Sequence, residues 1–188
     1  LYKEPYSFNI GRFMDEKRFE KIKIFAEDIP TPCLIIDLDT IRNKYLELQA
    51  TMPNYKVFYA VKANPMDEVI LLLAGLGSNF DLASRYELDQ MLRLGIEPSR
   101  LSFGNTIKKP EDIKYFHDKG VDFFATDSMI DLENLAKYAP GSKILFRILT
   151  EGTGADWPLS RKFGSHPDTI YHLILKAASM NLQPWGIS

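Results

Sequence analysis

The chain has 188 residues, of which 45% are hydrophobic and 26% charged, and its formal net charge is -2 at pH 7. This is the composition of a globular protein with enough apolar residues to form a core. The near-neutral charge disfavours nucleic acid or an anionic membrane as the main partner, because both bind basic surfaces. The single cysteine, Cys33, excludes an intramolecular disulfide, and no apolar run approaches the ~20 residues that cross a bilayer. We therefore expect a cytoplasmic protein with no nucleic-acid or membrane partner.

From residue 33 onward, apolar runs typical of strands alternate with amphipathic stretches typical of helices. The first run, CLIIDL at 33–38, is interpreted as an entry strand. Six further strands are predicted at 57–63, 78–83, 100–104, 121–127, 143–149 and 184–188. Helices are predicted around 41–48, 69–76, 86–94, 111–119, 129–138 and 170–180. Because parallel neighbours need such crossovers, the alternation predicts an α/β fold with a parallel sheet.

Proline and glycine support these helix boundaries. Pro110 and Pro167 fit the first turn of a helix, where the missing N–H costs nothing. Gly95 and Gly120 fit helix C-terminal ends.

Polar residues gather at or near the predicted C-terminal ends of the six strands. These residues are Lys62, Asp81, Asn105, Asp127, Arg147 and Ser188. In parallel α/β folds, whether barrels or doubly wound sheets, this end carries the chemistry. The pattern therefore predicts a functional site at one rim of the sheet.

Lys62 is the unusual member of this group, because it interrupts the apolar run VFYAVKA. At the end of a buried strand, desolvation can lower the pKa of an ammonium group. The free amine is then a nucleophile toward carbonyls, including that of pyridoxal phosphate. The alternative is a structural lysine whose ammonium group reaches solvent.

The segment YAVKANP at 59–65 resembles the lysine segment of barrel-type, alanine-racemase-like pyridoxal phosphate enzymes, specifically the ornithine, lysine and diaminopimelate decarboxylases. The resemblance continues in order through TPCLIIDLD, SNFDLASRYEL, GVDFFATDS, ILFRI and RKFG. The stretch TGADWPLSRKFG looks most like the bacterial lysine/ornithine decarboxylases. The resemblance implies a (β/α)8 TIM-type barrel, of which about six strands are present.

The resemblance also implies roles for individual residues. Lys62 matches the catalytic Schiff-base lysine, and Asp81 and Glu87 match acidic positions near the cofactor. Arg147 matches the arginine beside the cofactor ring oxygen. Each has a structural alternative: Asp81 as a helix cap, Glu87 in a capping box with Ser84, and Arg147 in an ion pair. No metal is implied.

In the resembling family, the strand at PWGIS is followed by a ring-stacking histidine, a glycine-rich phosphate loop and the last two barrel strands. A β-rich domain then completes the active site across a dimer interface. We therefore expect residues 31–188 to be part of a pyridoxal phosphate-binding barrel within a longer, homodimeric enzyme. Residues 1–30 are expected to associate with the β-rich domain.

The activity implied by the resemblance is pyridoxal phosphate-dependent decarboxylation of a basic L-amino acid, ornithine or lysine, to a diamine in polyamine biosynthesis. The alternatives are a diaminopimelate decarboxylase or other enzyme of the same fold, and a non-catalytic pyridoxal phosphate-binding homologue. A doubly wound dinucleotide-binding domain is less well supported, because no G-x-G-x-x-G follows a strand.

Overall fold

The computed structural model describes residues 14–150 and 163–188. Two compact units divide the chain between Leu38 and Asp39, a few residues after the boundary that we predicted at 30/31. In the first unit, helix α1 (Glu16–Ala26) begins after Asp15, whose carboxylate accepts a hydrogen bond of 2.9 Å from the backbone N–H of Arg18. This capping contact satisfies one of the N–H groups that a helix start leaves without an internal partner.

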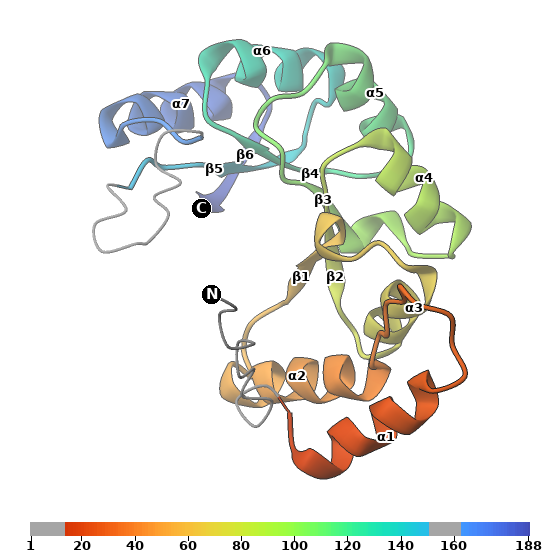
Figure 1. Cartoon of the computed structure of the whole chain (residues 1–188). Coiled ribbons are helices and arrows are strands. Elements are labelled where there is room, and N and C mark those ends of the chain that lie inside the picture. Colours follow the sequence, from red (N-terminus) through yellow and green to blue (C-terminus); the bar gives the residue numbers. More distant parts are fainter. Residues whose placement is uncertain (1–13, 151–162) are drawn as a thin grey trace, which may run out of the picture. The chain divides into compact units, whose positions relative to one another are not determined.

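The second unit contains a six-stranded parallel sheet in the order β1-β2-β3-β4-β5-β6 (Figure 1). The strands are β1 (Phe58–Ala60), β2 (Asn79–Leu82), β3 (Leu101–Phe103), β4 (Phe123–Thr126), β5 (Lys143–Phe146) and β6 (Gln183–Ile187). All five strand pairs are parallel. The six strands predicted from the sequence are therefore confirmed. The observed strands β1 to β5 are shorter than the predicted ranges, whereas β6 has the predicted length.

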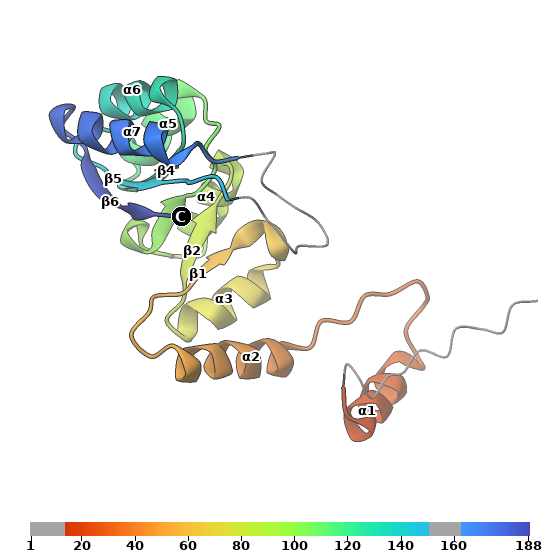
Figure 2. The same cartoon turned by 90° about the vertical axis from the view of Figure 1, so that its left-hand side faces the viewer.

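A helix precedes the sheet and five more connect its strands. They are α2 (Leu38–Thr51), α3 (Asp67–Gly75), α4 (Arg85–Arg93), α5 (Pro110–Asp118), α6 (Met129–Tyr138) and α7 (Pro167–Ser179). Because the strand order never reverses, right-handed crossovers place the connecting helices on one side of the sheet. Figures 1 and 2 show α4 to α7 along this outer side. This is the arrangement of a barrel wall, and it excludes the doubly wound alternative.

The core lies between the sheet and these helices. Side chains alternate along a strand, and in β2 the buried Phe80 and Leu82 point toward the helices while Asn79 and Asp81 remain half-buried. The Phe103 ring of β3 stacks on Phe116 of α5 with centroids 4.0 Å apart. Burying such large side chains provides about 1.5–3 kcal/mol each, so this layer holds the sheet in place.

The other face of the sheet, which carries Phe58, Asp81, Ser102 and Phe123, is called the concave face below. Phe58 of β1 and Phe123 of β4 meet edge to face with ring centroids 5.7 Å apart, although two strands separate them. The sheet must curve strongly for these rings to touch. Over the described residues, β1 and β6 have no further strand beside them, so the curved sheet is not closed.

The predicted entry strand CLIIDL is wrong. Residues 33–37 form no regular structure, Leu34 is 84% exposed, and helix α2 begins at Leu38. A strand and an irregular segment can both contain six apolar residues in a row, because tertiary packing decides which of the two structures such a run adopts. No helix in the described part of the chain is long and apolar enough to cross a membrane.

Candidate active site

Lys62 follows β1 directly, in a single turn of 3-10 helix, η2 (Val61–Ala63). The Val61 side chain is fully buried, whereas Lys62 is exposed. Its position after the C-terminal end of a strand is confirmed, and of the two environments considered from the sequence the exposed one is observed over the described residues. The apolar run suggested burial, and the turn instead directs the lysine away from the core.

Asp81 lies in the middle of β2 on the concave face. Its Oδ1 accepts a hydrogen bond of 2.7 Å from the hydroxyl of Ser102 on β3. Burial raises the pKa of the Asp81 carboxyl, while the Ser102 hydroxyl, the charges of Lys62 and Arg147, and the Gly104 N–H lower it. Asp81 does not cap the next helix, because Ser84 is the N-cap of α4.

Arg147 immediately follows β5. Its backbone N–H donates to the carbonyl of Thr126 (2.8 Å), which extends the pairing with β4 by one residue. Its guanidinium carbon lies 5.3 Å from the centre of the Phe163 ring, a distance at which a cation is attracted to the ring. Among the described residues, no carboxylate lies close enough to Arg147 for a direct ion pair, so the structural alternative proposed from the sequence is not observed there.

Glu87 occupies the first turn of α4 and forms a variant of the predicted capping box, in which its carboxylate binds the residue before the N-cap Ser84. The Ser84 side chain accepts from the Glu87 N–H (3.3 Å), and the Glu87 carboxylate accepts from the Ala83 N–H (2.6 Å). This contact gives Glu87 a structural role at the start of the helix. Its assignment to a cofactor remains a prediction.

Of the four predicted site residues, Lys62 and Arg147 lie within range for their positive charges to lower the pKa of the Asp81 carboxyl, although among the described residues no hydrogen bond or ion pair joins the three side chains. They reach this region from the ends of β1 and β5 and from β2. Ser102 and Gly104 also contact Asp81, and sequence reasoning missed both. Their small side chains next to a strand end give only a weak signal.

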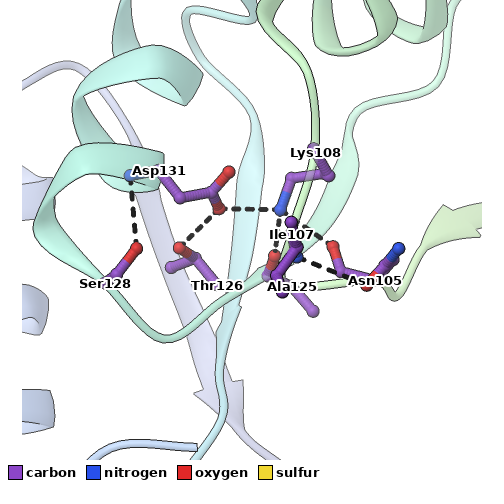
Figure 3. Close-up of polar contacts among 7 residues, drawn as sticks. All are labelled: Asn105, Ile107, Lys108, Ala125, Thr126, Ser128 and Asp131. Atoms are coloured by element: carbon purple, nitrogen blue, oxygen red, sulfur yellow. Dashed lines mark hydrogen bonds and ion pairs between the residues drawn. The ribbon is translucent and has the colours of Figure 1, made fainter. Parts of the chain in front are cut away.

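A second polar cluster, also missed, ties together the loop after β3, the strand β4 and the helix α6 (Figure 3). The ammonium group of Lys108 donates to the carbonyls of Asn105 (3.0 Å) and Ala125 (2.6 Å) and to the carboxylate of Asp131 (2.7 Å). Asp131 also accepts from the Thr126 hydroxyl (2.6 Å). The Lys108 side chain has no exposed surface, and that of Asp131 is 9% exposed.

Burial lowers the pKa of Lys108 and raises the pKa of Asp131, while the charge of each partner acts on the other in the opposite direction. Three acceptors surround the ammonium group and two donors reach one carboxylate oxygen. We therefore take both groups as charged at neutral pH, since hydrogen bonds to the charged forms favour them. This cluster holds the ends of two neighbouring strands in fixed positions.

Asp127, at the end of β4, fixes the segment that leads into α7. Its carboxylate accepts from the backbone N–H of Gly164 (2.8 Å), and its carbonyl accepts from the Ser165 hydroxyl (2.6 Å). The Ser165 N–H in turn donates to the carbonyl of Arg147 (3.0 Å). Gly164 has φ +95°, and a Cβ there would lie 2.8 Å from the Ile148 carbonyl oxygen. Asp127 therefore helps to hold the backbone beside Arg147.

Most of the ADWPLSRKFG stretch, up to residue 162, lies outside the described residues, as do residues 1–13.

The arrangement suits a carbonyl cofactor with a phosphate group. An exposed primary amine, Lys62, can reach a carbonyl carbon, and Arg147 supplies a permanent positive charge nearby. Asp81 adds a carboxylate set closely against Gly104, where a larger residue would not fit. A primary amine can bind the carbonyl carbon of pyridoxal phosphate and a cation can face its anionic groups, so the residues present fit this cofactor.

Comparison with known proteins identifies the family of this chain. Residues 38–188 match the family model described as pyridoxal-dependent decarboxylase, pyridoxal binding domain. A lysine/ornithine decarboxylase of Selenomonas ruminantium is 35% identical over 168 residues, which cover 89% of this chain and 43% of that protein.

Two solved structures share the fold. SrLDC in complex with pyridoxal phosphate and cadaverine has a TM-score of 0.80 and 34% identity, covering 93% of this chain and 43% of that one. Lysine/ornithine decarboxylase of Vibrio vulnificus with putrescine has a TM-score of 0.79 and 26% identity, covering 93% and 46%.

The fold and the matched residues define a pyridoxal-binding barrel domain with an α/β architecture. The chain belongs to the family of pyridoxal-dependent decarboxylases, and pyridoxal phosphate is the cofactor of this domain. It spans less than half the length of the relatives that it matches.

Proposed function

We propose that the protein to which this chain belongs decarboxylates a basic L-amino acid, ornithine or lysine, to the corresponding diamine. The observation that supports the proposal is that the positive charges of Lys62 and Arg147 both act on the Asp81 carboxyl within a pyridoxal-binding barrel domain. Relatives named for lysine and ornithine support the choice of substrate class.

In this proposal Lys62 holds the cofactor through its Nζ and is released when the amine of the substrate takes its place. When bound, pyridoxal phosphate supplies the electron sink that accepts the charge left by loss of carbon dioxide. The freed Lys62 amine would hold a proton at Nζ and could return it to the substrate after carbon dioxide is lost. Arg147 and Asp81 orient the bound group and balance its charges.

The substrate class has a further physical requirement. A terminal ammonium group in a dry pocket needs an acidic partner, because leaving such a charge unpaired costs several kcal/mol. Family resemblance places that acid after Ser188.

We also propose that the enzyme works as a homodimer in the cytoplasm, in polyamine biosynthesis. In this proposal Glu87 lies near the cofactor, and residues 1–30 associate with a β-rich domain.

Two measurements test the proposal. Borohydride reduction followed by peptide mapping is expected to place a pyridoxyl group on Lys62, and a label on another lysine would contradict that assignment. Assays of carbon dioxide release with ornithine, lysine, arginine and diaminopimelate are expected to favour ornithine or lysine. Preference for diaminopimelate, or racemisation without carbon dioxide release, would contradict the proposed activity.

A further inference from the structure

The Asp81 carboxylate lies in a space that β3 leaves open for it. A Cβ on Gly104 would lie 2.5 Å from Oδ2 and 2.6 Å from Cγ of Asp81, and both distances are shorter than those of ordinary non-bonded contacts. Gly104 does not have a positive φ, so the backbone conformation itself does not require glycine. The requirement at this position is steric, and the atoms that impose it belong to Asp81.

Ser102 lies two residues before Gly104. Asp81 and Ser102 are direct partners in the parallel register, and on the other side Asp81 pairs with Ala60 of β1. Asp81 is thus flanked across the sheet by two small residues. Ser102 is 6% exposed, and its hydroxyl donates a hydrogen bond of 2.7 Å to Oδ1 of Asp81. The hydrogen bond fixes one carboxylate oxygen, and Gly104 makes room for the group as a whole.

Four groups act on the Asp81 carboxyl from three elements besides its own strand. Lys62 acts from η2 and Arg147 from the end of β5. The Ser102 hydroxyl acts from β3, and the backbone N–H of Gly104 acts from the residue just after β3. All four favour the ionised carboxylate, while burial opposes it. A carboxylate held in one orientation directs its charge toward the two cations.

We propose that Ser102 and Gly104 are positioning residues for Asp81, Ser102 by its hydrogen bond to Oδ1 and Gly104 by the absence of a side chain. Together they direct the Asp81 carboxylate toward the region where Lys62 and Arg147 receive pyridoxal phosphate. The part of the inference that concerns pyridoxal phosphate rests on the proposed function, whereas the contact of Ser102 and Gly104 with Asp81 does not.

The test uses Ser102→Ala and Gly104→Ala in the full protein, with matched controls. Ser142→Ala removes a buried serine hydroxyl that has no hydrogen-bond partner among the described residues. Gly75→Ala adds a Cβ where no atom lies within 4 Å. Ser102→Thr keeps the hydroxyl and serves as the conservative variant.

The first readout needs no cofactor. Carboxyl ¹³C NMR titration, with the Asp81 signal assigned through Asp81→Asn, is expected to show a higher Asp81 pKa in Ser102→Ala than in the wild type. Ser102→Thr is expected to restore most of the wild-type value, and Ser142→Ala to leave it unchanged. An unchanged Asp81 titration in Ser102→Ala overturns the inference, whether or not pyridoxal phosphate binds.

The second readout is the Kd for pyridoxal phosphate, followed by absorbance. A hydrogen bond to a charged group is worth about tenfold in an equilibrium constant, so Ser102→Ala is expected to raise the Kd by up to about tenfold. Gly104→Ala is also expected to raise the Kd, because its Cβ would displace the Asp81 carboxylate. Gly75→Ala and Ser142→Ala are expected to bind as the wild type does. Equal binding by Gly104→Ala and Gly75→Ala overturns the role of Gly104. A wild type that binds no pyridoxal phosphate contradicts the proposed function instead.

Discussion

Asp81 illustrates how a partly buried carboxyl group can reduce stability. Its carboxyl is half-buried on the concave face, and burial raises its pKa above the ordinary value of an aspartate. Between these two pKa values the folded state binds more protons than the unfolded state. The free energy of unfolding therefore falls as pH rises through this window, and above it the ionised group lowers stability.

We predict that Asp81→Asn raises the free energy of unfolding at pH 7, because it removes the charge that burial disfavours. The gain is expected to disappear below about pH 3.9, the ordinary aspartate pKa, where the carboxyl is protonated in both states. Urea unfolding of the cofactor-free protein at several pH values measures this difference. A variant less stable than the wild type at pH 7, or a gain that persists at low pH, would show that the sign is wrong.

For single residues, a role could be predicted from the sequence only where the interacting residue lies nearby in the chain. The capping box of Ser84 and Glu87 was predictable because its members lie within one helical turn. The roles of Ser102 and Gly104 were not, because their partner Asp81 lies on another strand, 21 residues from Ser102. The turn that carries Lys62 was also missed, because the apolar run VFYAVKA continues past the end of β1.

At the level of elements, the buried cluster of Lys108 and Asp131 joins the loop after β3 to β4 and to α6. Removing one member of a buried ion pair leaves an uncompensated charge and typically costs 3–5 kcal/mol. Here the loss would affect the ends of two strands that carry the functional rim.

We predict that Lys108→Met lowers the free energy of unfolding by about 3–5 kcal/mol, measured by urea unfolding. The double variant Lys108→Met/Asp131→Leu is expected to recover much of this loss, since it leaves no buried charge behind. Lys114→Met serves as the control, because Lys114 and Asp118 form an exposed pair on α5 worth less than about 1 kcal/mol. If the two single variants lose equal stability, the cluster does not have the role assigned to it.

The order and type of the elements were more predictable than their ends. Pro110 and Pro167 open α5 and α7 as expected, and Gly95 and Gly120 follow α4 and α5 with φ of +75° and +90°. Helix α1 had no counterpart in our sequence analysis. It lies in a unit with few apolar residues in a periodic pattern, so the sequence gives little sign of it.

For the molecule as a whole, the described sheet has two open edges, β1 and β6, and the exposed Lys62 lies just after the edge strand β1. Unpaired strand edges favour association between chains, and an active site shared with other segments cannot form on one face alone. The relatives that the chain matches are more than twice as long as the part that it covers.

We therefore predict that residues 1–188 expressed alone show no decarboxylase turnover, although the full protein does. Carbon dioxide release from ornithine and lysine measures this, and pyridoxal phosphate at saturating concentration controls for loss of cofactor. Soluble, monomeric residues 1–188 with the turnover of the full protein would refute the prediction.

The strictly sequential order of the strands also affects how the chain can fold during synthesis. Phe58 pairs with Asn79, Phe80 with Leu101 and Phe103 with Phe124, each 21 residues further along. Phe124 pairs with Ile144, 20 residues on, whereas Ile144 pairs with Pro184, 40 residues on. Up to β5, each strand can therefore dock soon after it leaves the ribosome, with no need for a distant partner. The last step closes a loop twice as long, which costs only about 0.6 kcal/mol more in chain entropy, so the delay for β6 comes mainly from the time needed to make the additional residues.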